Sequence, residues 1–73
     1  MEDKYEVSAT DRAAIIEANL RQIHGSIYNE VIKKRVADKV VDTAMSDAAK
    51  KELERLEKLK DAYLEMLKEV RSE

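Results

Sequence analysis

The best candidate for chemistry in this sequence is a small polar cluster. His24 is the only histidine, and Arg21 and Tyr28 lie one helical turn before and after it in a segment with a helical pattern. An imidazole, a phenol and a guanidinium at this spacing can transfer protons, or can stack on a ring and hold an anion. Ser26 is the only Ser or Thr within a helical turn of His24, and no third group is spaced to orient a base. We therefore expect a structural cluster and a chain that is not an enzyme.

Basic residues gather directly after this cluster. Lys33, Lys34 and Arg35 are consecutive, and Lys39 follows one turn later. Such a run is usually a solvated helix face, but it also suits phosphate contacts, and copies of it can converge in an oligomer. The alternative function is therefore an oligomer that sequesters a phosphate-bearing ligand, a nucleotide or a nucleic acid. The candidate anion site comprises Arg21, His24, Tyr28, Lys33, Lys34 and Arg35.

The composition excludes several other classes of site. The 73 residues contain no Cys, no Pro, one His and one Gly, which argues against disulfide scaffolds, thiol nucleophiles, Gly-rich phosphate loops and zinc sites. We expect no metal and no cofactor. The 16 acidic residues nearly balance the 14 basic ones, which disfavours a dedicated nucleic-acid-binding protein. Neither a membrane span nor a secretory signal is evident, so we expect a cytoplasmic protein that does not enter a membrane.

The elements that must position these residues are helices. Residues 1–7 indicate a flexible acidic tail, and residues 8–73 a single helical domain that begins at an N-cap such as Ser8. Apolar residues then recur at alternating steps of three and four, and this heptad pattern predicts one long helix over about residues 9–45. We call six positions of this pattern the seam and expect them to form the oligomer interface: Ile16, Leu20, Ile23, Ile27, Glu30 and Lys34. Glu30 and Lys34 are expected to form an ion pair within it.

Gly25 interrupts the long helix. Glycine costs about 1 kcal/mol relative to alanine inside a helix, and Ser26 offers an N-cap directly after it. The seam nevertheless keeps its phase from Ile23 to Ile27, so we expect the helix to continue. A three-helix bundle, in which Gly25 ends a first helix, is the alternative left open.

Ser46 and Asp47 are the predicted chain reversal, because both have N-cap chemistry and a new apolar pattern follows them. The second helix is expected over about residues 47–71. Its apolar stripe contains Leu53, Leu56, Leu59, Tyr63, Met66, Leu67 and Val70. Without a turn at this point, the whole chain would be one helix on the order of 90 Å long.

The two helices predict an all-α fold, an antiparallel helical hairpin that assembles into a helical-bundle or coiled-coil oligomer, because a chain this small usually needs assembly for stability. The expected core is Ile16, Leu20, Ile23, Ile27, Leu53, Leu56, Tyr63, Leu67 and Val70. A second apolar stripe, Tyr28, Ile32 and Val36, steps by four along another face, and we expect it to bind another protein. The expected function is a small non-enzymatic adaptor, scaffold or inhibitor. Its partners would be itself, as a dimer or higher homo-oligomer, and a second protein.

Overall fold

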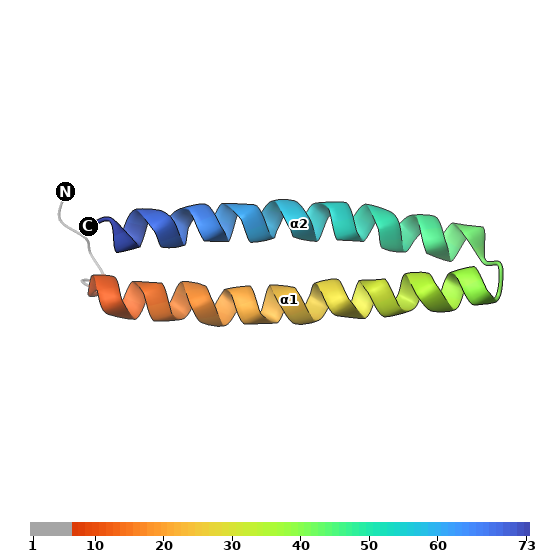
Figure 1. The fold of residues 1–73 in the computed structure, drawn as a ribbon, viewed down its shortest axis with the longest axis horizontal. Helices are drawn as coiled ribbons and strands as arrows, with labels where there is room; N and C mark the ends of the chain where they lie inside the picture. The colour runs from red at the N-terminus through yellow and green to blue at the C-terminus, as the bar shows by residue number, and fades with distance from the viewer. Residues whose placement is uncertain (1–6) are drawn as a thin grey trace.

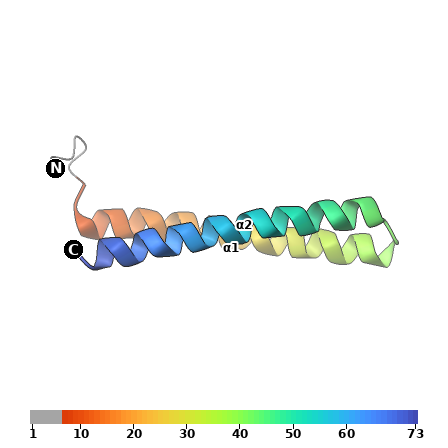
Figure 2. The ribbon, with the colours of Figure 1, turned by 90° about the horizontal axis from the view of Figure 1, so that it is seen from above.

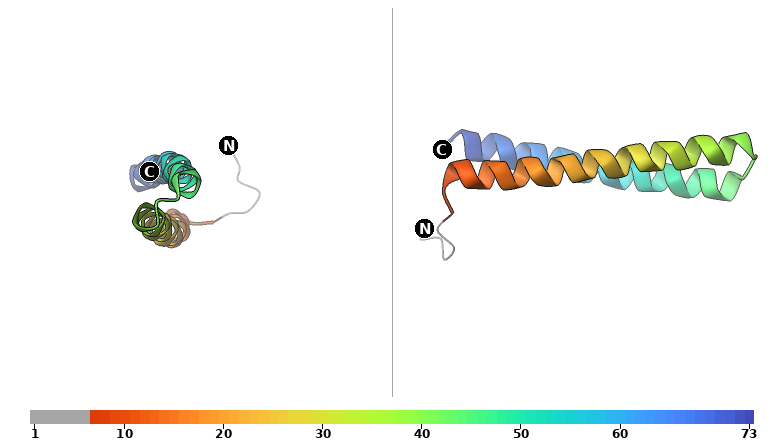
Figure 3. Two further views of the ribbon diagram at one scale, coloured as in Figure 1. Left: turned by 90° about the vertical axis from the view of Figure 1, so that its right-hand side faces the viewer. Right: turned by 90° about the horizontal axis from the view of Figure 1, so that it is seen from below.

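The computed structural model describes residues 7–73 as two antiparallel α-helices joined by a short turn (Figure 1). Helix α1 spans Ala9–Lys39 and helix α2 spans Thr43–Arg71. The helices lie side by side along their whole length and cross at a shallow angle (Figures 2 and 3). The molecule measures 53 × 20 × 16 Å. The predicted all-α hairpin is confirmed, while the predicted tail lies outside the described residues except for Val7.

Helix α1 begins where the sequence predicts. The Ser8 side chain accepts a hydrogen bond from the Asp11 backbone N–H at 3.1 Å, which satisfies one of the free donors of the first turn. Asp11 also places a negative charge at the positive end of the helix dipole.

Gly25 lies within continuous helix, so the three-helix alternative is wrong. A Cβ atom added at Gly25 would meet no atom within 4 Å, which shows that no close approach requires glycine there. Ile23 is buried and Ile27 half-buried on the same side of α1. Burial of both flanking side chains maintains the helix through a residue that disfavours it.

The chain reverses at residues 40–42, and the predicted reversal at Ser46–Asp47 is wrong. Val41 has φ of 56°, a left-handed conformation that β-branched residues rarely adopt. The Asp42 N–H donates to the Ala37 carbonyl at 2.8 Å and the Val41 N–H to the Asp38 carbonyl at 3.3 Å, the two bonds of a Schellman motif. The sequence lacks the usual signal for this motif, because valine occupies the position that glycine normally fills.

Helix α2 consequently starts four residues earlier than predicted. Asp42 is its N-cap, and the carboxylate accepts from the Met45 N–H at 3.0 Å. Ser46 and Asp47 lie inside α2, where the Ser46 hydroxyl donates to the Asp38 carboxylate of α1 at 2.8 Å. The first helix therefore ends at Lys39 instead of residue 45, and the alternative of one unbroken helix is wrong as well.

The core is a single layer of side chains between the two helices. Six of the predicted core residues are buried, namely Ile16, Leu20, Ile23, Leu56, Leu67 and Val70, and three are half-buried, namely Ile27, Leu53 and Tyr63. Ala37 and Ala49 are buried in addition. No large side chain of residues 7–73 is fully enclosed, because each helix has only one neighbour.

The seam faces α2 of the same chain. Ile16, Leu20 and Ile23 are buried there, and Ile27, Glu30 and Lys34 are half-buried. An oligomer interface at the seam would require the hairpin to open, so these six positions form an intramolecular interface in this structure. Ser46, Ala49, Leu53, Leu56, Lys60, Tyr63, Leu67 and Val70 form the complementary heptad of α2 and are all buried or half-buried.

Large apolar side chains also remain on the surface. Leu59 and Met66, which the sequence placed in the apolar stripe of the second helix, are exposed, as are Ile15, Leu64 and Val40. Leu59 and Met66 each directly precede a residue of the complementary heptad of α2 and point to one side of it, so a single neighbouring helix does not cover them. Neither α1 nor α2 contains a stretch long and apolar enough to cross a membrane within the described part of the chain.

Candidate functional site

The predicted interaction stripe lies on the outer side of α1. Tyr28, Ile32 and Val36, the outer stripe, are 64%, 45% and 47% exposed. Their spacing by four residues places them on one continuous line, with Ile32 nearly opposite the buried seam. Val40 extends the line at the end of α1. The outer stripe therefore presents contiguous apolar surface that the hairpin itself does not use.

The border of the outer stripe is basic. Arg35 and Lys39 are exposed and follow Tyr28 and Ile32 by seven residues, which places each on the same line of the helix surface. Within residues 7–73, neither forms an ion pair. Their charges are therefore available to a partner.

The other cations of the basic run are already paired. Lys33 contacts the Glu30 carboxylate at 3.2 Å and Lys34 contacts Asp38 at 3.0 Å, so the predicted pair between Glu30 and Lys34 is wrong. The Asp38 carboxylate also accepts from Ser46 of α2, and these hydrogen bonds, first from Ser46 and then from Lys34, lower its pKa. Asp38 thereby joins the end of α1 to the start of α2 and draws Lys34 towards the turn.

The six predicted anion-site residues do not converge. Consecutive helix residues point about 100° apart, so Lys33, Lys34 and Arg35 face three directions. Arg21 and His24 line a shallow pocket of about 280 Å³ on the side of the hairpin where Arg35 lies, together with Glu17, Leu20, Leu67 and Arg71. Arg71 pairs with Glu17 at 3.4 Å beside it. Within residues 7–73, no three His, Asp or Glu side chains lie close enough together to hold a metal ion, and His24 is therefore not part of such a group.

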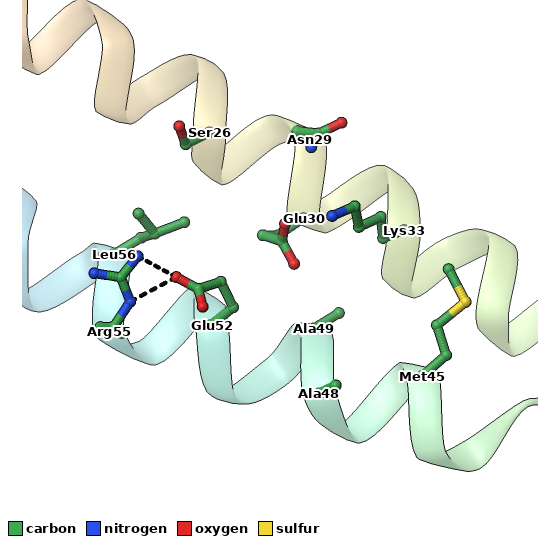
Figure 4. Close-up of a pocket in the computed structure, with 10 residues that line it drawn as sticks. All are labelled: Ser26, Asn29, Glu30, Lys33, Met45, Ala48, Ala49, Glu52, Arg55 and Leu56. Atoms are coloured by element: carbon green, nitrogen blue, oxygen red, sulfur yellow. Dashed lines mark hydrogen bonds and ion pairs between the residues drawn. The ribbon is translucent and has the colours of Figure 1, made fainter.

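A larger depression of about 550 Å³ lies between the helices near the turn (Figure 4). The small side chains of Ala48 and Ala49 on α2 and of Ser26 on α1 leave space between the longer side chains that surround them. Figure 4 shows Glu30 and Lys33 on one wall and the paired Glu52 and Arg55 on the other. The described residues include no buried side-chain polar atom without a hydrogen-bond partner, and the polar side chains Ser26 and Asn29 of this depression are exposed to solvent. The depression is an open groove suited to side chains of another helix.

Sequence reasoning missed this groove and its residues Glu52 and Arg55. The heptad patterns of both helices were available, but their mutual register depends on the true position of the turn. The Asp38–Ser46 and Arg12–Glu73 contacts show that residue i of α1 lies level with about residue 85 − i of α2. With the turn at the predicted Ser46–Asp47, the register between the helices would be different, and Lys33 would not lie level with Glu52.

Searches against protein-family models, curated proteins and solved structures found no match to this chain.

Proposed function

We propose that this chain is a small non-enzymatic protein-interaction module, an oligomeric helical hairpin that holds an amphipathic helix of another protein against the outer stripe. One observation carries the proposal: Tyr28, Ile32 and Val36 are large apolar side chains, each about half exposed or more, aligned along the outer side of α1. An apolar line at this spacing suits helix-to-helix docking through residues at matching intervals.

The size of the outer stripe favours a weak, exchangeable complex. Complete burial of a large apolar side chain contributes about 1.5–3 kcal/mol, and these three are already partly covered. Association also costs several kcal/mol of translational and rotational freedom. Apolar contact alone therefore supports binding in the micromolar range or weaker, and charges must add selectivity.

The basic border defines the charge of the partner. Arg35 and Lys39 have no acidic neighbour within ion-pair distance among residues 7–73, and they flank the outer stripe. A helix with acidic residues beside its apolar line would pair with both cations. The expected partner is thus an acidic amphipathic helix, and a basic one is disfavoured.

A designed peptide tests this function directly. The probe is a fluorescent amphipathic helix with leucines spaced by three and four and glutamates on either side, and the control peptide carries lysines instead. Fluorescence anisotropy should show saturable binding of the glutamate peptide only. Ile32→Lys together with Val36→Lys should weaken that binding at least tenfold, whereas Leu64→Lys, at an equally exposed site on α2, should not.

Two results would contradict the proposal. One is failure of the glutamate peptide to bind wild-type protein, and the other is equal binding by the outer-stripe variant with circular dichroism showing intact helices. The phosphate-binding alternative has less support, because Lys33 and Lys34 are paired with carboxylates and Arg35 points elsewhere. A fluorescent nucleotide that binds in place of the peptide would favour that alternative.

A further inference from the structure

The middle of one side of the hairpin has no charged residue at its outward positions, although charged residues border it at both ends. On α1, the side that contains Arg12 and Lys33 carries between them Ile15 and four uncharged polar residues, Asn19, Gln22, Ser26 and Asn29. On α2, the same side carries between Arg55 and Glu69 the residues Leu59, Ala62 and Met66. We call these four polar residues and three apolar residues the neutral face.

Two depressions show that these residues share one side of the hairpin. The larger is lined by Ser26, Asn29 and Arg55, and a second of about 340 Å³ is lined by Ile15 and Met66. Helical spacing places Asn19 and Gln22 between Ile15 and Ser26 on α1, and Leu59 and Ala62 between Arg55 and Met66 on α2. The uncharged stretch of α1 extends for about 30 Å at 1.5 Å per residue.

The opposite side of the hairpin is different in character. Charged residues recur along it on both helices: Arg21, Arg35, Glu54, Glu57, Asp61 and Lys68. A helix surface that faces water is normally charged in this way. The absence of charge from the neutral face therefore requires another explanation.

We infer that the neutral face binds a second copy of this chain, giving a four-helix bundle of two hairpins. This inference deepens the proposed function, since it locates the oligomer interface that the function assumes. The whole side of the hairpin, including the charged residues at both ends of the neutral face, offers roughly 800–1,000 Å² per copy in a molecule measuring 53 × 20 × 16 Å, which meets the ~800 Å² per partner of a stable interface. The neutral face forms the central part of this side, about 30 Å long. The small residues Ser26 and Ala62 allow close approach, and Leu59 and Met66, exposed in one hairpin, become core.

The charges that border the neutral face determine the orientation of the second copy. With the two-fold axis parallel to the helices, α1 of each copy packs on α2 of the other at the same level. Lys33 then lies opposite Glu52 of the second copy, since both are near the same level of the hairpin, and this contact adds to the pairs that Lys33 forms with Glu30 and Glu52 with Arg55 in each chain. Arg12 lies opposite Glu69 and Glu73 of the second copy in the same way.

The reversed orientation is less favourable. It places the turns at opposite ends and packs α1 on α1 and α2 on α2 of the second copy. The border cations of α1, Arg12 and Lys33, then face the same cations of the other copy, and the border acids of α2 face acids, which is unfavourable. The two turns of the dimer therefore lie at the same end, and Tyr28 and Ile32 of the outer stripe remain on the outside of the bundle.

Substitutions on the neutral face test the interface. Ala62→Glu and, separately, Gln22→Glu introduce a charge at exposed positions of this face, and Ala18→Glu introduces one on the outer side of α1. Light scattering after size exclusion should give twice 8.4 kDa for wild type and Ala18→Glu, and a single chain for the two neutral-face variants at the same concentration. Circular dichroism checks that both remain helical. A wild-type mass other than two chains, or a folded Ala62→Glu and Gln22→Glu that both stay dimeric, overturns the inference.

A distance measurement tests the orientation without disturbing the interface. The chain has no cysteine, so Lys39→Cys provides one spin-labelling site beside the turn. Turns at the same end place the two labels roughly 20–35 Å apart, the width of four helices packed 8–10 Å apart plus the labels. Labels separated by about the 53 Å length of the hairpin contradict the proposed orientation. Val36 follows Gln22 and Asn29 of the neutral face at intervals of seven residues, so the variant that separates the two surfaces is Tyr28→Lys with Ile32→Lys. It should lose peptide binding and remain dimeric, so loss of peptide binding and loss of self-association are distinguishable.

Discussion

Replacing Gly25 with alanine should stabilise the hairpin, although nothing in the chain contacts the added methyl group. Gly25 lies in the middle of α1, and a Cβ atom there would meet no atom within 4 Å. Alanine is favoured over glycine in a helix interior by about 0.5–1 kcal/mol, chiefly because the unfolded glycine has more backbone freedom to lose. No steric cost opposes this gain, so the whole amount should appear as added stability.

The expected gain is measurable in a chain of this size. For a domain of 60–100 residues, 1 kcal/mol shifts the melting temperature by about 4–8 °C, so Gly25→Ala should raise it by about 2–8 °C. Thermal unfolding followed by circular dichroism at 222 nm measures the shift. The protein concentration must be the same for each variant, because the stability of an oligomer depends on it.

Ala18 provides a matched control for Gly25. It lies seven residues earlier, is exposed, and occupies the same position of the heptad. Ala18→Gly should lower the melting temperature by a similar amount, and the double variant should melt close to wild type because the sites are far apart. If Gly25→Ala left the stability unchanged or lowered it while Ala18→Gly behaved as expected, α1 would not be continuous at Gly25.

Three further predictions concern the turn, the core and the acid range. Val41→Gly should stabilise the hairpin by about 1 kcal/mol in urea unfolding, because it relieves a left-handed backbone at φ of 56°; destabilisation would contradict the turn geometry. Leu20→Ala should cost about 2–3 kcal/mol, because Leu20 is only 6% exposed, whereas Leu64→Ala at 45% exposure should cost less than about 1 kcal/mol; similar urea midpoints would contradict the core assignment. The lowered pKa of Asp38 means that its bonds to Ser46 and Lys34 stabilise the fold above the ordinary value of 3.8 and are lost as the pH falls below it. In the Asp38→Asn variant the melting temperature should therefore fall less steeply with decreasing pH below about pH 4. A fall as steep as that of wild type would show that Asp38 does not contribute.

Much of the fold follows from periodicity, which the sequence shows directly. The seam keeps its phase through Gly25 and through the two charged residues Glu30 and Lys34, and all six positions face the second helix. Burial of every third and fourth residue depends only on helix geometry, so this part of the core was predictable.

The turn was not predictable from local chemistry. Asp42 and Ser46 both have N-cap side chains, and valine at position 41 gives no sign of a left-handed residue. The choice between the two sites is made by packing: Ser46 belongs to the heptad that includes Ala49 and Leu53, so α2 must begin before it. Contacts distant in sequence therefore override the local capping signal.

The surfaces were predictable only in part. The exposure of Tyr28, Ile32 and Val36 follows from their phase relative to the seam, whereas the neutral face combines residues of both helices. Its α1 and α2 halves become one surface only when the register set by Asp38 and Ser46 is known. The neutral face consists of uncharged residues from both helices, so it cannot be predicted from the pattern of either helix alone.

Two separate surfaces are proposed for the hairpin: the neutral face, which a second copy covers, and the outer stripe around Tyr28 and Ile32, which is left free for a partner. NMR with a soluble gadolinium chelate tests this directly, because the chelate broadens signals from atoms that water can reach. We expect the side chains of Leu59, Ala62 and Met66 to be protected at concentrations where the dimer forms, while Tyr28 and Ile32 broaden strongly. Protection of Tyr28 and Ile32 together with broadening at Leu59 and Met66 would show instead that copies associate through the outer stripe.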